Sequence, residues 1–123
     1  MTIIPNFLLK KIYQKGSLRV TEEGIAFDLK NILGPGLITG INFVKINDKV
    51  YNSSVIGIIK SGVKTLAEKV SSDNPLLIKL NEEITCVLKS GSDLQKGIND
   101  IIVELISDDV GKVCVKLSDV VTA

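Results

Sequence analysis

The stretch "GIAFDLKNILGPGLITGINFVKIND", residues 24–48, decides the fold class of this chain. In its first part Ile25, Phe27 and Leu29 occupy alternate positions, which is the period of two expected of a half-buried strand. Its last part, from residue 37 onward, is rich in β-branched residues and also alternates. The stretch therefore predicts two strands joined by a corner.

The corner is "GPGLITG", residues 34–40, and its glycines resemble the start of a loop that binds a phosphate. Such a loop needs a helix after it, so that backbone N–H groups point at the phosphate. Here Pro35 removes one N–H from the loop, and a β-rich segment follows in place of a helix. We therefore interpret the corner as a Gly-Pro-Gly turn between strands, in which glycine supplies positive φ angles.

Further strands with a period of two are predicted at "EITCVLK" (83–89) and "GKVCVKLSD" (111–119). The run "DIIVELIS" (100–107) is apolar on both faces, which indicates a central strand or one covered by a partner. Turn residues separate the strands at "TEEG" (21–24), "NDK" (47–49), "SGSD" (90–93) and "SDDVG" (107–111). Together these features predict one all-β domain over residues 1–123, an antiparallel β-sandwich or partly open barrel of roughly eight short strands.

One segment departs from this pattern. In "VKTLAEKV", residues 63–70, Val63, Leu66, Ala67 and Val70 have the spacing of an amphipathic helix. The spacing predicts a short helix or an irregular crossing near 63–70. Because the segment is only about two helical turns long, a strand with a bulge is the alternative.

Charge and hydrophobicity restrict the classes of partner. The chain has 15 Lys and Arg against 14 Asp and Glu, and 4% aromatic residues, which argues against nucleic-acid binding. No apolar run is long enough to cross a membrane, and the N-terminus lacks the features of a secretory signal, so we expect a cytoplasmic protein. The 45% hydrophobic content is high for a small domain, which favours a homo-oligomer or association with a larger protein subunit.

The residues offer little for catalysis. The chain contains no His, which removes the usual general base and the commonest transition-metal ligand. The two cysteines, Cys86 and Cys114, lie within predicted strands, and we expect buried free thiols unless the two strands face each other. We therefore predict no catalytic residue, no metal and no cofactor. The candidates for ligand contacts are Arg19, Gly34, Gly36 and Tyr51.

Parts of the chain resemble a known family. "KGSLRVTEEGIAFDLKN" (15–31) and "ITGINFVKINDKVYNSSVIGI" (38–58) are similar to the beginning of the small β subunit of C-glycoside deglycosidases. The stretch from residue 74 to 105 is similar to short uncharacterised archaeal proteins of the same type. The resemblance implies a β-sandwich that works beside a partner, because the metal and active site of the deglycosidases belong mainly to the α subunit.

Short archaeal proteins of this kind are also labelled hydroxymethylglutaryl-CoA reductase. The residues give that label no chemical support, because such a reductase needs a nicotinamide site, a CoA site and a catalytic His in a much longer chain. We therefore expect a non-catalytic accessory or interaction subunit. The alternative is a domain that binds a small ligand or carbohydrate, such as the small subunit of a sugar lyase or deglycosidase.

Overall fold

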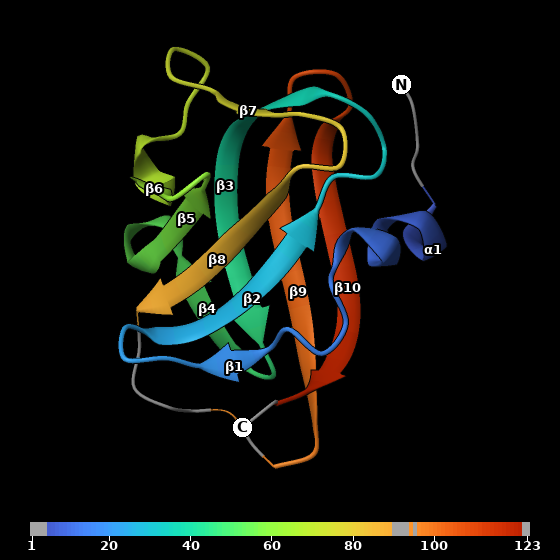
Figure 1. Cartoon of the computed structure of the whole chain (residues 1–123), viewed down its shortest axis with the longest axis vertical. Helices are drawn as coiled ribbons and strands as arrows, with labels where there is room; N and C mark the ends of the chain where they lie inside the picture. The colour runs from blue at the N-terminus through green and yellow to red at the C-terminus, as the bar shows by residue number, and fades with distance from the viewer. Residues whose placement is uncertain (1–4, 90–93, 95, 122–123) are drawn as a thin grey trace.

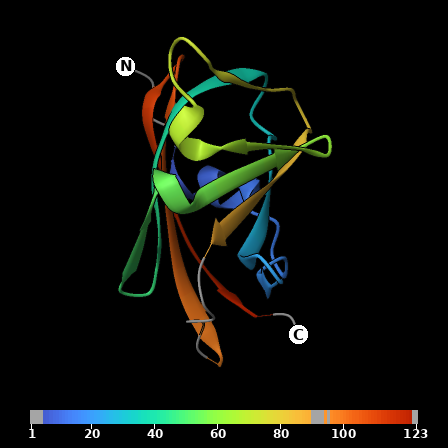
Figure 2. The same cartoon turned by 90° about the vertical axis from the view of Figure 1, so that its left-hand side faces the viewer.

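The computed structural model describes residues 5–89, 94 and 96–121, and these form ten strands in two antiparallel sheets that face each other (Figures 1 and 2). The prediction of an all-β sandwich is therefore confirmed, with ten strands where roughly eight were expected. No helix among the described residues is long and apolar enough to span a membrane.

The first sheet has the strand order β1-β2-β8-β5-β6 and the second β10-β9-β3-β4, with β7 paired to the start of β3. The strands of the first sheet are β1 (Arg19–Val20), β2 (Gly24–Lys30), β8 (Glu83–Lys89), β5 (Ile56–Lys60) and β6 (Val63–Leu66). The strands of the second are β10 (Gly111–Val120), β9 (Ile98–Ser107), β3 (Gly36–Ile46), β4 (Lys49–Asn52) and β7 (Leu76–Ile78).

The Gly-Pro-Gly corner carries the chain from β2 in one sheet to β3 in the other (Figure 1). Gly34 has a φ of +131°, a conformation that side-chain-bearing residues rarely adopt. Gly36 already belongs to β3, where it pairs with Ile78 of β7. The interpretation as a corner is confirmed for residues 34 and 35, with the positive φ at Gly34, whereas residues 36–40 belong to β3 and neither Gly36 nor Gly40 has a positive φ.

The core lies between the sheets and is built from the alternate positions that the sequence indicated. Ile25 and Phe27 of β2 are fully buried. The second sheet contributes Ile101 and Val103 of β9 to the same hydrophobic cluster. Because β9 lies between β3 and β10, its two-sided apolar pattern is that of a central strand.

Three of the four predicted turns are present. Residues 21–24 join β1 to β2, with mutual backbone hydrogen bonds between Thr21 and Gly24. Residues 47–49 join β3 to β4, and Asn47 has a φ of +55°. Residues 107–111 join β9 to β10. The fourth predicted turn, residues 90–93, lies outside the described residues.

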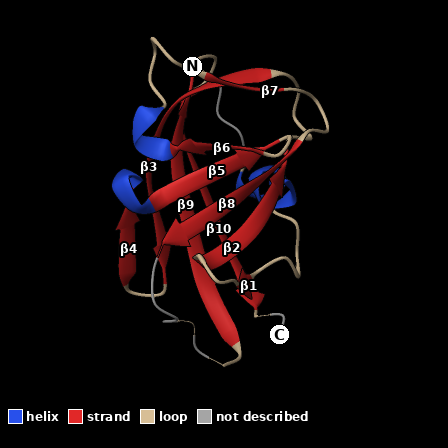
Figure 3. Cartoon of the chain, turned by 60° about the vertical axis from the view of Figure 1, so that its left-hand side comes forward, coloured by secondary structure: helices blue, strands red, loops and turns tan. Residues whose placement is uncertain are grey.

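Of the two alternatives for residues 63–70, the strand is formed and the α-helix is not, and the pairing with β5 has no bulge. Val63–Leu66 is strand β6, and only the 3₁₀ turn η3 (Ala67–Lys69) follows it (Figure 3). The turn at Ser61 and Gly62, with φ angles of +51° and +79°, folds β6 back on β5. The hairpin forms although the apolar residues are spaced as in a helix. A two-residue turn with positive φ angles at both positions matches the twist of the paired strands.

The helical turns near the N-terminus were not predicted from the sequence. These are α1 (Asn6–Leu9) and the 3₁₀ turn η1 (Lys10–Ile12), and a further 3₁₀ turn, η2, covers Ser53–Val55. Pro5, which directly precedes α1, was the available signal, because proline is common at helix starts.

The segment from α1 to β1, which we call the N-terminal strap, closes one side of the sandwich. Tyr13 forms an isolated antiparallel bridge with Leu29 in the first sheet. Its hydroxyl donates a hydrogen bond of 2.6 Å to the Asp119 carboxylate in the second sheet, and the Gly16 N–H donates another of 2.8 Å. The strap therefore ties β2 of the first sheet to the edge strand β10 of the second.

Asp119 is a buried charge, at 6% exposure, that is stabilised by donors. Burial alone would raise the pKa of its carboxyl, but hydrogen bonds from Tyr13, Gly16, Val120 and Leu18 outweigh burial and lower it. Burial and the bond to Asp119 raise the pKa of the Tyr13 hydroxyl, so it remains a donor at neutral pH. Both shifts favour the ionised Asp119 and the neutral Tyr13.

We expect Asp119→Asn to lower the free energy of unfolding at pH 7 by about 1–3 kcal/mol, because charge-assisted hydrogen bonds are lost. The pKa of the Asp119 carboxyl is lower in the folded state than in the unfolded state, where it is about 3.9. The ionised carboxylate therefore stabilises the fold above about pH 3.9, and this stabilisation is lost as the pH falls through the pKa of the folded state. The difference between wild type and variant should therefore shrink below about pH 4. Urea unfolding across this pH range measures it, with the exposed Asp73→Asn as control. A difference independent of pH would contradict the role of the charge.

Candidate functional site

An apolar pocket opens between the two sheets at the end of the sandwich that holds the Gly-Pro-Gly corner. Its cavity volume is about 240 Å³. The pocket draws its walls from both sheets and from η1, so it exists only because the two layers and the strap meet there. The aliphatic side chains that line it are Ile12, Leu29, Leu33, Ile38, Ile78, Ile84, Leu105, Val110, Val113 and Val115.

One side of the mouth is the Gly-Pro-Gly corner, which Asn31 holds in place. The Asn31 side-chain amide donates to the carbonyl oxygens of Gly34, at 2.6 Å, and Ile78, at 3.2 Å. Its oxygen accepts a bond of 3.2 Å from the Leu33 N–H. The Asn31 backbone also bonds to Asn81 and Glu82, in the turn after β7. The Asn31 side chain thus fixes the corner, and its backbone fixes the neighbouring turn.

The other side of the mouth is the turn between β9 and β10. The Asp108 N–H bonds to the Leu37 carbonyl at 2.9 Å, and the Asp109 N–H bonds to the Ser107 hydroxyl at 3.3 Å. Asp109 is exposed, and it is the one charged residue among those that line the pocket in the described part of the chain. The mouth is therefore acidic and the interior apolar.

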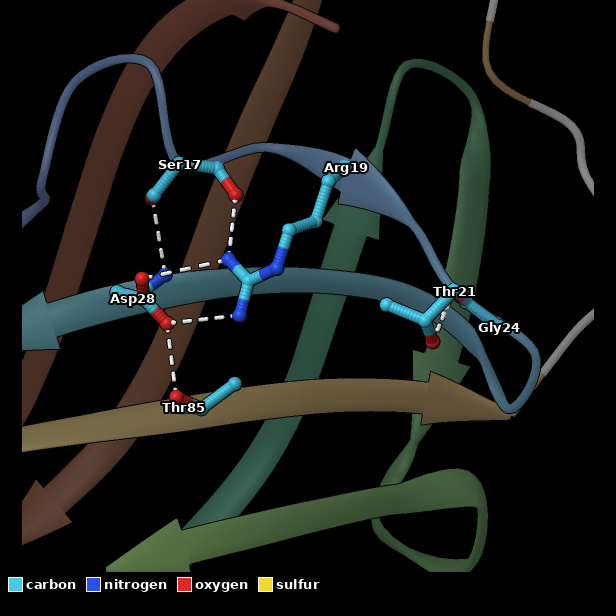
Figure 4. Close-up of polar contacts among 6 residues, drawn as sticks. All are labelled: Ser17, Arg19, Thr21, Gly24, Asp28 and Thr85. Atoms are coloured by element: carbon cyan, nitrogen blue, oxygen red, sulfur yellow. Dashed lines mark hydrogen bonds and ion pairs between the residues drawn. The ribbon is translucent and has the colours of Figure 1, made fainter. Parts of the chain in front are cut away.

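The four residues proposed from the sequence as ligand contacts do not form one site. Only Gly34 and Gly36 line the pocket. Tyr51 lies on β4 and is buried in the core at 3% exposure. Arg19 lies on β1 and forms an ion pair with Asp28 of β2, at the surface of the first sheet (Figure 4).

The Arg19 cluster is a structural network across three strands. The guanidinium donates two bonds of 3.3 Å to the Asp28 carboxylate and one of 2.7 Å to the Ser17 carbonyl. The Thr85 hydroxyl of β8 donates to the same carboxylate at 2.8 Å, and Ser17 accepts from the Asp28 N–H (Figure 4). These bonds join β1, β2 and β8.

The cysteines lie in different sheets and both are free. Cys86 is buried as predicted, and burial, with a smaller effect of Asp28, raises the pKa of its thiol to about 12. Its thiolate is therefore scarce at neutral pH. Cys114 was expected to be buried but is partly exposed, because its side chain lies on the Lys112 and Lys116 face of β10. Among the described residues, no group of His, Cys, Asp and Glu side chains is arranged to hold a metal ion.

Comparison with known families assigns the chain. The family described as "Hydroxymethylglutaryl-CoA reductase, N-terminal domain" matches residues 8–122. The chain belongs to this family. No curated protein matches the chain.

This assignment corrects the sequence analysis at two points. The resemblance to the deglycosidase β subunit was wrong, because it depended on short strand patterns that recur in many β proteins. The rejection of the hydroxymethylglutaryl-CoA reductase label was also wrong. That rejection required the sites of a whole reductase. A family described as an N-terminal domain need not contain those sites.

We expect Asn31→Ala to lower the free energy of unfolding by about 1–2 kcal/mol, because Gly34, Ile78 and Leu33 lose their side-chain partner. Hydrogen exchange of the Leu33 amide should also become faster. Urea unfolding and amide exchange measure the two effects. The matched control is Asn42→Ala, whose exposed side-chain amide donates one bond to the Glu104 carboxylate, and it should change stability by less than about 0.5 kcal/mol. Equal effects of the two variants would contradict the role of Asn31.

Proposed function

We propose that this member of the reductase N-terminal domain family is a non-catalytic accessory domain that binds an apolar group in its end pocket. The observation that carries the proposal is the pocket itself. A cavity of about 240 Å³ with aliphatic walls is larger than the apolar cavities of roughly 150 Å³ that bind benzene. Apolar pockets with a few polar groups at the mouth are typical small-molecule sites.

The polar groups at the mouth support binding over catalysis. Asn31 uses both its amide and its oxygen to hold the corner, and the Ser107 hydroxyl accepts a bond from the Asp109 backbone. A serine nucleophile has to pass its proton to a base, whereas the hydrogen bond at Ser107 comes from the Asp109 backbone N–H and does not use the Asp109 carboxylate. These side chains shape the mouth of the pocket.

The chemistry of the walls also favours one ligand class over another. Sugars and phosphates need several side-chain donors and acceptors, whereas this pocket is almost entirely aliphatic. An apolar ligand gains roughly 25 cal/mol for each Å² of apolar surface that it buries there. The pocket therefore supports the small-ligand alternative of the sequence analysis, but with an apolar ligand in place of a carbohydrate.

The accessory role is supported by the family description. An N-terminal domain is by its name one part of a larger protein, and a domain of this kind would act beside a catalytic part. The pocket would then supply a binding site near the reaction without taking part in it.

A test of the binding function is titration calorimetry with 1-octanol on the wild type and on Val113→Trp. Val113 lines the pocket, so the indole should occupy the cavity and abolish binding. Since the chain has no native tryptophan, the fluorescence of the V113W variant reports the surroundings of the new indole directly, and its emission should be blue-shifted. The matched control is Val50→Trp on β4, at a position 58% exposed, which should bind octanol normally and emit like solvated tryptophan. Failure of the wild type to bind octanol would overturn the proposed function.

Self-association is a second proposal, and the edge strand β6 favours it. β6 is the last strand of the first sheet, and its Val63 is 65% exposed. Unpaired edges of this kind readily pair with another chain. A second copy joined through β6 would cover this edge without using the pocket mouth.

We expect light scattering after size exclusion to give at least a dimer at micromolar concentration. Val63→Lys should shift the protein toward monomer, because a charge on the edge opposes strand pairing. Val50→Lys, on the edge of the other sheet, should leave the assembly unchanged. A monomeric wild type would rule out the β6 dimer.

A further inference from the structure

We propose that the end pocket binds the aliphatic part of a cationic amphiphile, an alkyl amine in chemical class, in preference to a fatty acid or an acyl phosphate. This inference rests on the proposed function and adds the charge and size of the ligand. It comes from two properties of the site, the volume and lining of the cavity and the charge of its mouth.

The volume sets the size of the ligand. If a cavity of about 150 Å³ holds the six carbons of benzene, then 240 Å³ holds roughly ten non-hydrogen atoms. An eight-carbon chain with its head group at the mouth is of this size. The walls are aliphatic, from Leu29 and Ile84 in the first sheet to Leu105 and Val113 in the second. They offer burial to a chain but no aromatic ring for stacking.

The mouth sets the charge of the head group. Asp109 lines the pocket, and Asp108 precedes it in the same turn. Both side chains are exposed, and neither forms an ion pair in the described residues. No lysine or arginine is among the described lining residues, so a carboxylate or phosphate at the mouth would meet the Asp109 charge with no basic side chain in the pocket lining. An ammonium group would meet an attractive partner instead.

The backbone of the turn keeps this charge in place. The Asp108 N–H bonds to the Leu37 carbonyl of β3, and the Asp109 N–H bonds to Ser107. The turn is therefore attached to β3 one residue after Gly36, and the acidic turn lies beside the Gly-Pro-Gly corner. An amine head group between them would lie close to carboxylate oxygens while its chain fills the cavity.

The test compares octylamine, 1-octanol and octanoate by titration calorimetry at low salt, on the wild type and three variants. We expect the affinity to decrease in the order amine, alcohol, carboxylate, with roughly a tenfold difference or more between amine and carboxylate. Asp109→Asn should reduce the advantage of the amine over the alcohol several-fold. Asp73→Asn, an exposed acid that does not line the pocket, should leave all three affinities unchanged. Val113→Trp should abolish binding of all three.

The outcomes separate this inference from the proposed function. If all three ligands bind the wild type equally, or octanoate binds best, the charge preference is overturned while the apolar pocket stands. If Asp109→Asn leaves the amine preference intact, the role of the acidic mouth is overturned. If none of the three binds, both proposals fail. Circular dichroism of each variant establishes that a loss of binding is not a loss of folding.

Discussion

The buried carboxylate of Asp119 is the interaction on which much of the sandwich depends. It lies near the end of the last strand, and it accepts hydrogen bonds from Tyr13 and Gly16 near the start of the chain. Through Tyr13 it connects β10 to Leu29 at the edge of β2. A charge at 6% exposure is costly unless it is fully bonded, so this carboxylate fixes the strap in one position. The strap in turn delivers Ile12 to the pocket wall.

The pocket follows from the way the chain changes sheets. β2 and β3 are consecutive in sequence but belong to different layers, and the corner between them spans the end of the sandwich. Strand β7 pairs with the start of β3 and extends the second sheet at this end. Asn31 joins the corner to β7 through the Ile78 carbonyl. These connections hold the layers together at the rim, while the side chains beneath them leave a cavity.

The sequence predicted the parts of this structure that local patterns determine. The period of two identified β2, β8 and β10, and glycine and polar residues identified the turns around them. The sequence does not decide between helix and strand for residues 63–70, because their spacing fits a helix, whereas pairing with β5 depends on contacts across the sheet. The site was predicted in part, since Gly34 and Gly36 do line the pocket but Arg19 and Tyr51 lie elsewhere. Inward-facing residues such as Val113 and Ile38 have the same sequence pattern as core residues. The sequence therefore does not show whether they line a cavity or pack against a neighbour.

The Gly-Pro-Gly corner has one more consequence. In loops that hold phosphates, consecutive backbone N–H groups turn toward the bound anion. Here Pro35 has no N–H, and Gly36 is already part of the ladder with β7. The corner therefore does not offer the consecutive free backbone N–H groups with which a glycine-rich loop binds an anion. The same glycines that resemble a phosphate loop in sequence form, in this fold, a rim poor in hydrogen-bond donors.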